Sequence, residues 1–346
     1  MAYTTINKST DYQNGIIING NGSTQALTGV GHQPDWIWMK RSNATGHHRL
    51  IDTVRGISKI NNSDLNNSEA TTASYVTAIG TDGWTVGNNT DVNPSGGVTM
   101  GWSWRAGQGT TTNPSGGTIT TTASVDTTAG LSIFTYTGTG TAAHLAHGLG
   151  VAPTVVWIKG RTNTDQWFVK HPGLNANQYV YLNGTGAATS GANVWSATNP
   201  DATKIYVGTD AGVNGSGEDY VCYAFAEKRG YSKFGTYKGN NNSDGVFVYT
   251  GFKPSFLLIR RAAGSQNWVI IDNKRPGYNG VATGDSQILR PNTADAQTEN
   301  NGVDLLSNGF KCRSSDGDTN GYSDTYIYMA FGQSLVGTNN IPASAR

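Results

Sequence analysis

The sequence predicts an all-β protein of three tandem antiparallel β-sandwich units, each with a jelly-roll-like arrangement of strands. One observation behind this is a pattern of about 100 residues that occurs three times. A second is that the apolar segments are short, rich in β-branched and aromatic residues, and separated by turns rich in Gly, Asn, Thr and Ser. A third is that no segment has the apolar period of an amphipathic helix. These features favour antiparallel sandwiches.

Each copy of the repeat contains a proline, an apolar run and a basic residue. The three runs read PDWIWMK, PTVVWIK and PSFLLIR, and the copies end in the matching strands VTMGWSW, DYVCYAF and TYIYMAF. The residues that correspond between the copies are Pro34, Pro153 and Pro254; Lys40, Lys159 and Arg260; His48, Trp167 and Trp268; Asp52, His171 and Asp272; and Trp104, Phe225 and Phe331.

The elements of one unit are clearest in the third copy. GVFVYTG alternates in polarity and favours a strand, which the proline of FKP ends because proline lacks a ladder donor. SFLLIRR is a continuous apolar run, which predicts a strand buried on both faces, and NWVIID predicts the strand that returns. A polar, irregular stretch then leads to two further strands. The strands expected in chain order are 245–251, 255–261, 267–272, 305–314 and 325–331.

These boundaries divide the chain into six segments. The second and third units are joined only by EKRGYSKFG, so we expect them to pack closely and the first unit to be more independent. The first and second units are joined by a Thr/Gly/Ser-rich segment that reads as a linker. The expected segments are an N-terminal segment (1–14), unit 1 (15–105), the linker (106–130), unit 2 (131–230), unit 3 (231–334) and a C-terminal tail (335–346).

The composition excludes several partners. Charged residues make up 14% of the chain and the formal net charge is +1, which leaves no long-range field to attract nucleic acid or an anionic membrane. No apolar run approaches the roughly 20 residues that a membrane-spanning helix needs. We therefore expect no nucleic acid partner and no membrane insertion.

The candidate metal ligands fit a turn better than a metal site. DGDTNG opens like a calcium loop and offers Asp316, Asp318 and Asn320 as ligands. Such a loop needs an acidic side chain at its twelfth position, where Ile327 stands, so a β-turn is favoured over a weak calcium site. The serine motif GDS (284–286) has no histidine after it in the chain to act as a base. We expect no catalytic residue, no cofactor and no metal, and the ligand-binding residues are unknown.

Other reactive side chains also favour structural roles. Cys222 and Cys312 stand at non-equivalent places in their copies, so no disulfide framework is expected. Asp52, His171 and Asp272 each follow a returning strand, where a polar residue more often ends a turn than catalyses a reaction.

The aromatic residues on the expected strands have two interpretations. Trp38 and Trp157, in the runs after the proline, fit a hydrophobic core. The alternative is a platform on which sugars stack. Core packing is favoured, and we expect Trp104, Phe225 and Phe331 each to be buried in its own unit.

The order of these motifs resembles a repeat domain of unknown function in tail-fibre-like virion proteins of marine bacteriophages, of the cyanophage and pelagiphage type. The resemblance covers nearly the whole chain and is weaker in the first copy. It implies a structural component of the virion exterior, assembled in the host cytoplasm, and it brings no catalytic residues. The residues that carry it are Tyr136 to Gly140, Gly148 to Lys159, Gly251 to Arg260, Trp268, Ser307 to Phe310 and Tyr326 to Phe331.

The resemblance and the composition together lead to three hypotheses. The first is a non-enzymatic protein of the tail or fibre apparatus that contributes to host-surface attachment. The second is a capsid decoration or other head-exterior protein, and the third is a polysaccharide-degrading tailspike. Under the first hypothesis the partners are other virion proteins and a host cell-surface glycan. A homo-oligomer is expected, with a trimer favoured by analogy with fibres.

Overall fold

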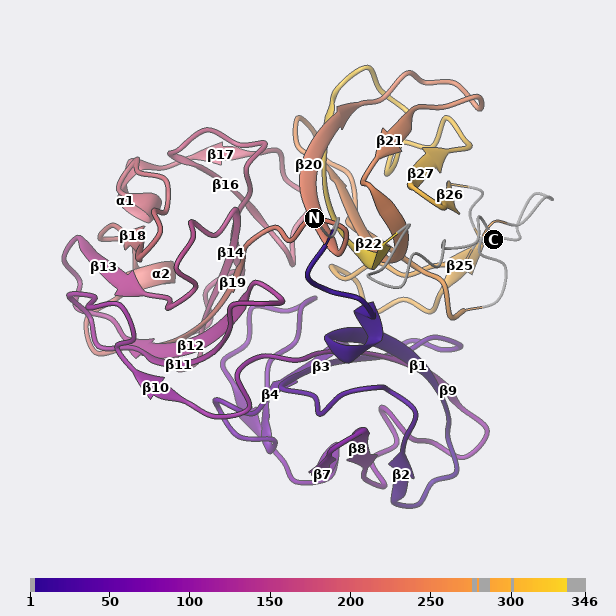
Figure 1. Ribbon diagram of the computed structural model, residues 1–346, viewed down its shortest axis with the longest axis horizontal. Helices are drawn as coiled ribbons and strands as arrows, with labels where there is room; N and C mark the ends of the chain where they lie inside the picture. Colours follow the sequence, from indigo (N-terminus) through magenta and orange to yellow (C-terminus); the bar gives the residue numbers. More distant parts are fainter. Residues whose placement is uncertain (1–3, 276–278, 280–286, 300–301, 335–346) are drawn as a thin grey trace.

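The computed structural model of the chain describes residues 4–275, 279, 287–299 and 302–334. Within them the chain is almost entirely β, and the helices are short: η1 (Ser9–Asp11), α1 (Ala192–Trp195) and α2 (Ala211–Asn214). Three lobes surround a common centre (Figure 1). The predicted all-β fold is confirmed. The serine motif at 284–286 and the tail at 335–346 lie outside the described residues.

Three main antiparallel sheets share one strand order. In each, the last strand of the unit lies between the first and the third, and the fourth lies beyond the third. We interpret this common order as the structural counterpart of the sequence repeat. The strands are β1 (Gln13–Asn19), β9 (Val98–Trp104), β3 (Trp36–Arg41) and β4 (Arg49–Asp52) in unit 1; β12 (Leu131–Thr137), β19 (Asp219–Phe225), β14 (Val155–Gly160) and β15 (Phe168–Lys170) in unit 2; and β20 (Ser232–Lys238), β28 (Thr325–Ser334), β22 (Phe252–Arg261) and β23 (Val269–Asp272) in unit 3.

A smaller sheet packs on the outer side of each main sheet, which completes a sandwich. The outer strands are β2 (Gln25–Leu27), β8 (Gly83–Val86) and β7 (Val76–Gly80) in unit 1; β13 (Ala143–Ala146) and β18 (Lys204–Val207) in unit 2; and β21 (Phe247–Tyr249), β27 (Gly309–Cys312) and β26 (Val303–Leu306) in unit 3. Short strands complete the connections: β5 (Lys59–Ile60), β6 (Ala70–Thr71), β16 (Gln178–Tyr181), β17 (Thr189–Ser190), β24 (Gln287–Ile288) and β25 (Thr298–Glu299).

The apolar run that ends in Lys40, Lys159 or Arg260 is a strand in each unit, as predicted. Pro34 and Pro153 lie just before β3 and β14, where no ladder donor is needed. Pro254 lies inside β22, and the pairing with β28 shifts register directly after it, between Pro254 and Phe256. The irregularity lets the strand accommodate a residue without an N–H.

The segment predicted as a linker is partly a strand. β10 (Thr111–Thr112) pairs with β11 (Thr122–Asp126), and β11 pairs with β12, so the segment extends the main sheet of unit 2. Thr and Val are good strand residues, and Gly130, with a positive φ of 75°, makes the tight return into β12. Composition alone suggested a flexible chain because threonine is common in both linkers and strands.

The last strand of each unit explains the repeated apolar sequence. β28 lies between two strands of its sheet, and its two faces pack against two different hydrophobic cores. Ile327, Met329 and Phe331 point to the centre of the molecule, whereas Tyr326 and Tyr328 alternate with them and point into the outer core of unit 3. A strand buried on both faces needs apolar residues at every position.

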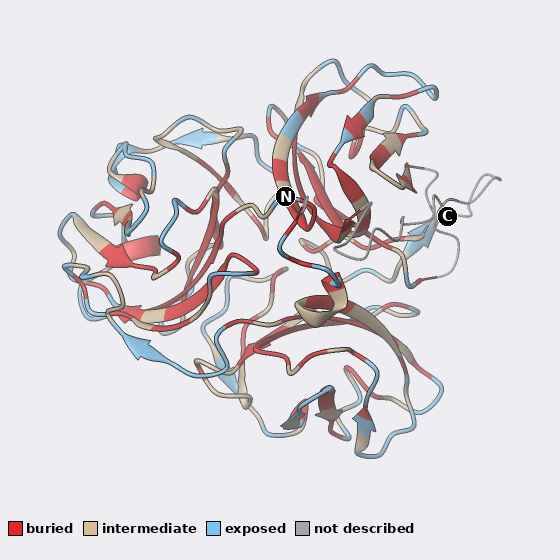
Figure 2. Ribbon diagram, in the orientation of Figure 1, coloured by how far each residue is buried: buried red, intermediate tan, exposed pale blue. Residues whose placement is uncertain are grey.

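The three main sheets share one central core. Phe331 of unit 3 contacts Trp104 of unit 1 and Phe225 of unit 2, with ring centroids 5.8 and 6.1 Å apart. Trp36 stacks on Trp104 at 4.3 Å and contacts Tyr223 of unit 2 at 4.9 Å. Trp104, Phe225 and Phe331 are buried, as expected, but they meet at the shared centre and do not each lie within a separate core of their own unit. Figure 2 shows the buried residues concentrated on the facing strands and the exposed ones in the outer loops.

Candidate functional site

Three equivalent basic residues are fully buried. Lys40 and Lys159 donate to the carbonyls of the next residue, each at 2.7 Å, and Lys40 also reaches the carbonyl of Ala294 in unit 3 at 3.3 Å. Arg260 donates to the carbonyl of Gly184 in unit 2 at 2.9 Å. Burial lowers the pKa of both lysines to about 8 and that of Arg260 to about 10. These cations stabilise loops and the contacts between units.

A second set of equivalent residues joins each unit to its neighbour. The indole N–H of Trp167 donates to the carbonyl of Asn62 in unit 1 at 2.7 Å, and the indole of Trp268 donates to the carbonyl of Tyr181 in unit 2 at 2.8 Å. Nε2 of His48 lies 3.0 Å from the carbonyl of Arg290 in unit 3. Since Nδ1 of His48 accepts from Trp38, Nε2 is the protonated nitrogen and donates.

The aligned acidic residues belong to the same junctions. Asp52 pairs with Arg55 and accepts from the hydroxyl of Tyr223 in unit 2 at 2.7 Å. Asp272 likewise pairs with Arg275, and the indole of Trp102 in unit 1 donates to it at 3.3 Å. Each carboxylate is buried but is satisfied by a cation and by a donor from the next unit.

The third junction uses a different pair for a clear reason. Trp102 in unit 1 and Tyr223 in unit 2 occupy equivalent positions, and Met329 occupies that position in unit 3. The side chain of methionine cannot donate a hydrogen bond. His171 replaces the aspartate and donates from Nε2 to the carbonyl of Tyr328 at 3.0 Å, while Nδ1 accepts from the backbone of Gly173. Burial lowers the pKa of His171 to about 4, so the ring is neutral.

The three junctions close the units into a ring. Unit 1 contacts unit 2, unit 2 contacts unit 3, and unit 3 contacts unit 1 through backbone bonds at equivalent places, including Gln297 N to Ser42 O at 2.7 Å. The expectation that unit 1 is more independent is therefore wrong. Most of the repeat-marker residues lie at the junctions or at the centre and contact other residues there, so they form a framework rather than a binding site.

The residues proposed as weak calcium ligands have protein partners. Asp318 accepts from the backbone of Asn267 at 2.9 Å and from Arg290 at 3.2 Å, and burial raises its pKa. Asp316 accepts from the backbone N–H of Asp318 at 2.8 Å, and Asn320 is fully buried. This is the geometry of a turn. In the part of the chain that the structure describes, no group of three His, Cys, Asp or Glu residues could hold a metal ion.

One set of equivalent residues was missed from the sequence. Asn93, Asn214 and Asn320 are fully buried, and each uses its amide to join the loop after the first strand to the turn before the last strand. The amide of Asn214, for example, donates to Thr141 O at 2.6 Å and to Gly208 O at 2.7 Å. The Val/Thr-Asn-Pro/Gly pattern at the three places was the available signal.

The remaining candidates are accounted for by packing. Trp38 and Trp157 are buried, which supports the core interpretation over a sugar platform. Cys222 and Cys312 are both buried free thiols. Within the described ranges, no helix has the length and apolar character needed to cross a bilayer.

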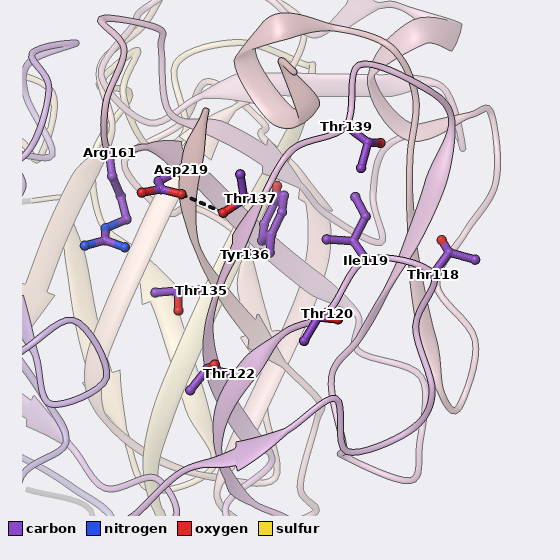
Figure 3. Close-up of a pocket in the computed structure, with 10 residues that line it drawn as sticks. All are labelled: Thr118, Ile119, Thr120, Thr122, Thr135, Tyr136, Thr137, Thr139, Arg161 and Asp219. Carbon is purple, nitrogen blue, oxygen red and sulfur yellow. Dashed lines mark hydrogen bonds between the residues drawn. The ribbon is translucent and has the colours of Figure 1, made fainter. Parts of the chain in front are cut away.

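A groove on unit 2 is the best candidate for a binding site. Its volume is about 500 Å³, within the range of small-ligand pockets. Figure 3 shows Arg161 and Asp219 at one end and Thr118 and Thr139 at the other. Six of the ten residues lining this Thr groove are threonines. Thr122 lies on β11, Thr135 and Thr137 lie on β12, and Thr118, Thr120 and Thr139 lie in the adjoining loops. The lining residues are Thr118, Ile119, Thr120, Thr122, Thr135, Tyr136, Thr137, Thr139, Arg161 and Asp219.

The charged residues of the Thr groove are held in place by neighbours. The hydroxyl of Thr137 donates to Asp219 at 2.7 Å. The guanidinium of Arg161 makes two bonds, at 2.9 and 3.0 Å, to Glu69 of unit 1 across the first junction. The junction between units 1 and 2 therefore holds one end of the groove in place.

The comparisons place the chain in a family. A family model described as a domain of unknown function (DUF7483) matches residues 8–334. The chain belongs to this family. The matched range begins before β1 and ends with the last residue of β28, so the family domain corresponds to the whole ring and not to one unit. Comparisons with curated proteins and with solved structures gave no match.

Proposed function

We propose that this protein is a non-enzymatic structural protein of a bacteriophage virion. It belongs to the tail or fibre apparatus on the virion exterior and contributes to attachment to the host surface. The observation that carries the proposal is the ring itself, in which a shared aromatic core holds three sandwiches and leaves their loops on the outside. Recognition sites are commonly placed on loops that a rigid scaffold positions.

The chemistry of the Thr groove supports binding rather than catalysis. Asp219 is the only carboxylate among the residues that line it. Hydrolysis of a glycosidic bond commonly uses two carboxyl groups about 5–10 Å apart, one acting as acid and the other as base or nucleophile. A single carboxylate that already accepts from Thr137 suits recognition of a ligand hydroxyl.

The low net charge of the chain supports attachment that depends little on salt. A formal net charge of +1 leaves little long-range attraction for salt to screen. Attachment through uncharged contacts then varies little with ionic strength. Single contacts of this kind are weak, and several copies on one particle raise the overall affinity. We therefore propose a homotrimer that binds other virion proteins and a host cell-surface glycan.

Gold-labelled antibody on intact particles tests the proposal, together with binding of the purified protein to host cells. We expect label on the tail or fibres, cell binding that changes little between low and high salt, and no release of reducing sugar from host polysaccharide. Label on the capsid shell without cell binding would instead support a decoration protein. Polysaccharide cleavage that disappears on removal of one carboxylate would support a tailspike. Light scattering tests the trimer, which a monomer in solution would contradict.

A further inference from the structure

The threonines of the Thr groove form an ordered array across neighbouring strands. Thr122 of β11 lies directly opposite Thr135 of β12, and Thr137 lies opposite Asp219 of β19. The backbone N–H of Arg161 donates to the carbonyl of Asp219, which continues the second row. Neighbouring strands are about 4.8 Å apart and alternate residues of one strand about 6.8 Å apart, so the array presents hydroxyls at regular spacing.

The hydroxyls of the array retain capacity for hydrogen bonds. Among the described residues, those of Thr120, Thr122 and Thr135 have no hydrogen-bond partner. The hydroxyl of Thr137 donates to Asp219 and keeps its lone pairs as acceptors. Each threonine also offers a methyl group, so the surface combines donors, acceptors and small apolar contacts.

The charges of the groove select against an acidic ligand. Arg161 is the cation among the lining residues, and it is already bonded to Glu69. Asp219 is the anion, and it can accept a bond from a ligand hydroxyl at its remaining lone pairs. An acidic sugar would meet the carboxylate without a free cation to compensate it. A neutral sugar avoids this cost.

The equivalent groove in unit 1 has a different lining, which distinguishes it from the Thr groove of unit 2. Its volume is about 440 Å³, and at the registers of Thr135, Thr137 and Asp219 it has Ile17, Asn19 and Val98. The repeat therefore supplies the position, and the residues of unit 2 supply the hydroxyls.

We propose that the Thr groove binds a neutral glycan segment, in which ligand hydroxyls bond to the threonine array and to Asp219. The inference rests on the proposed function in host attachment and names the site and the ligand class. A polyhydroxylated chain matches the array because each of its hydroxyls both donates and accepts.

The test is a titration of the full chain, with threonine methyl groups isotopically labelled, followed by NMR. The probes are the neutral hexasaccharides of glucose with α-1,4, β-1,4 and β-1,3 linkages, and a hexamer of galacturonic acid is the acidic comparison. We expect at least one neutral probe to shift the methyl signals of Thr122, Thr135 and Thr137. Thr137→Val and Asp219→Asn should each weaken that binding at least tenfold.

A matched control is available in unit 3. Thr236 lies opposite Ile327 as Thr135 lies opposite Val221, but it lies outside the Thr groove. Thr236→Val should leave binding unchanged. Folding of every variant is checked by its spectrum without ligand. The inference is overturned if no neutral probe shifts the groove signals, if the acidic hexamer binds more tightly, or if Thr137→Val binds as well as the unchanged chain.

Host cells separate this inference from the proposed function. If the unchanged chain and the Thr137→Val and Asp219→Asn variants bind cells equally and no neutral probe shifts the groove signals, attachment stands and the groove inference fails. If the unchanged chain binds a neutral probe through the groove but does not bind cells, the groove inference stands and the attachment function fails.

Discussion

Replacing Phe331 by alanine tests whether the three units form one cooperative body. Phe331 belongs to unit 3, is 3% exposed, and contacts the rings of Trp104 in unit 1 and Phe225 in unit 2. It also contacts Phe234 and Tyr231 of its own unit, at 5.4 and 5.8 Å. The substitution therefore opens a cavity on the surface where all three units meet.

The expected cost follows from the size of the cavity. A buried Phe→Ala substitution typically lowers the free energy of unfolding by about 3–5 kcal/mol. The entropy of unfolding, at about 2.1 cal/mol/K per residue, amounts to about 0.7 kcal/mol/K for a chain of this length. The melting temperature should therefore fall by about 4–7 °C if the chain unfolds in one transition.

Tryptophan fluorescence makes the test specific for cooperation between units. Trp268 is the only one of the nine tryptophans in unit 3, so the fluorescence signal comes chiefly from units 1 and 2. We expect Phe331→Ala to lower the midpoint seen by fluorescence together with that seen by circular dichroism. Phe310→Ala is the matched control for the outer core of unit 3, where Phe310 contacts Tyr237 and Tyr328.

Two outcomes would refute the reasoning. One is a fluorescence midpoint that stays in place while part of the circular dichroism transition moves, since the units would then unfold separately. The other is an unchanged melting curve by both probes, which would mean that the ring of Phe331 is not buried at the centre. In the Phe310→Ala control, the midpoints seen by fluorescence and by circular dichroism are expected to fall together. The reason is that loss of stability in unit 3 also breaks its junctions with units 1 and 2.

Three further predictions concern the junctions and turns. His171→Asp should lower the free energy of unfolding by about 3–5 kcal/mol, because Met329 offers no donor to the buried carboxylate. Urea unfolding at pH 7 measures this change. A decrease no larger than that caused by a substitution at an exposed position would contradict the prediction. Folding lowers the pKa values of Lys40 and Lys159 from 10.5 to about 8, so between about pH 8 and 10 the unfolded chain binds more protons and the free energy of unfolding should rise with pH. The urea midpoint should rise over this range, and it should rise less in Lys40→Met. A urea midpoint of the unchanged chain that does not vary with pH would argue against burial of the charges. Asn320→Ala should cost about 1–3 kcal/mol, because buried backbone groups lose their amide partner; thermal unfolding checks this, and an unchanged melting temperature would show that the amide does not hold the turn.

The sequence determined several strands of the third copy and the corresponding residues of the copies, but not β20, whose residues were interpreted as part of the join between the second and third units. The apolar segments TYIYMAF and DYVCYAF and the runs after each proline were sufficient, because a strand buried on both faces must be apolar along its whole length. The calcium-like loop forms a turn, and Ile327 at its twelfth position lies in a strand. The hydrophobicity of a strand and the residues of a turn are local properties, so they can be predicted from a short stretch of sequence.

Only the tertiary structure decided how the units are joined. Trp167, Trp268 and His48 bond to backbone carbonyls of the neighbouring unit, and every residue has a carbonyl, so the partner leaves no mark in the sequence. The change from aspartate to His171 is intelligible only beside Met329, which lies far away in the chain. The Thr groove exists because β11 pairs with β12, and threonine composition alone does not distinguish such a strand from a linker. Contacts between distant segments depend on how the sheets are placed, and that placement is a property of the folded chain.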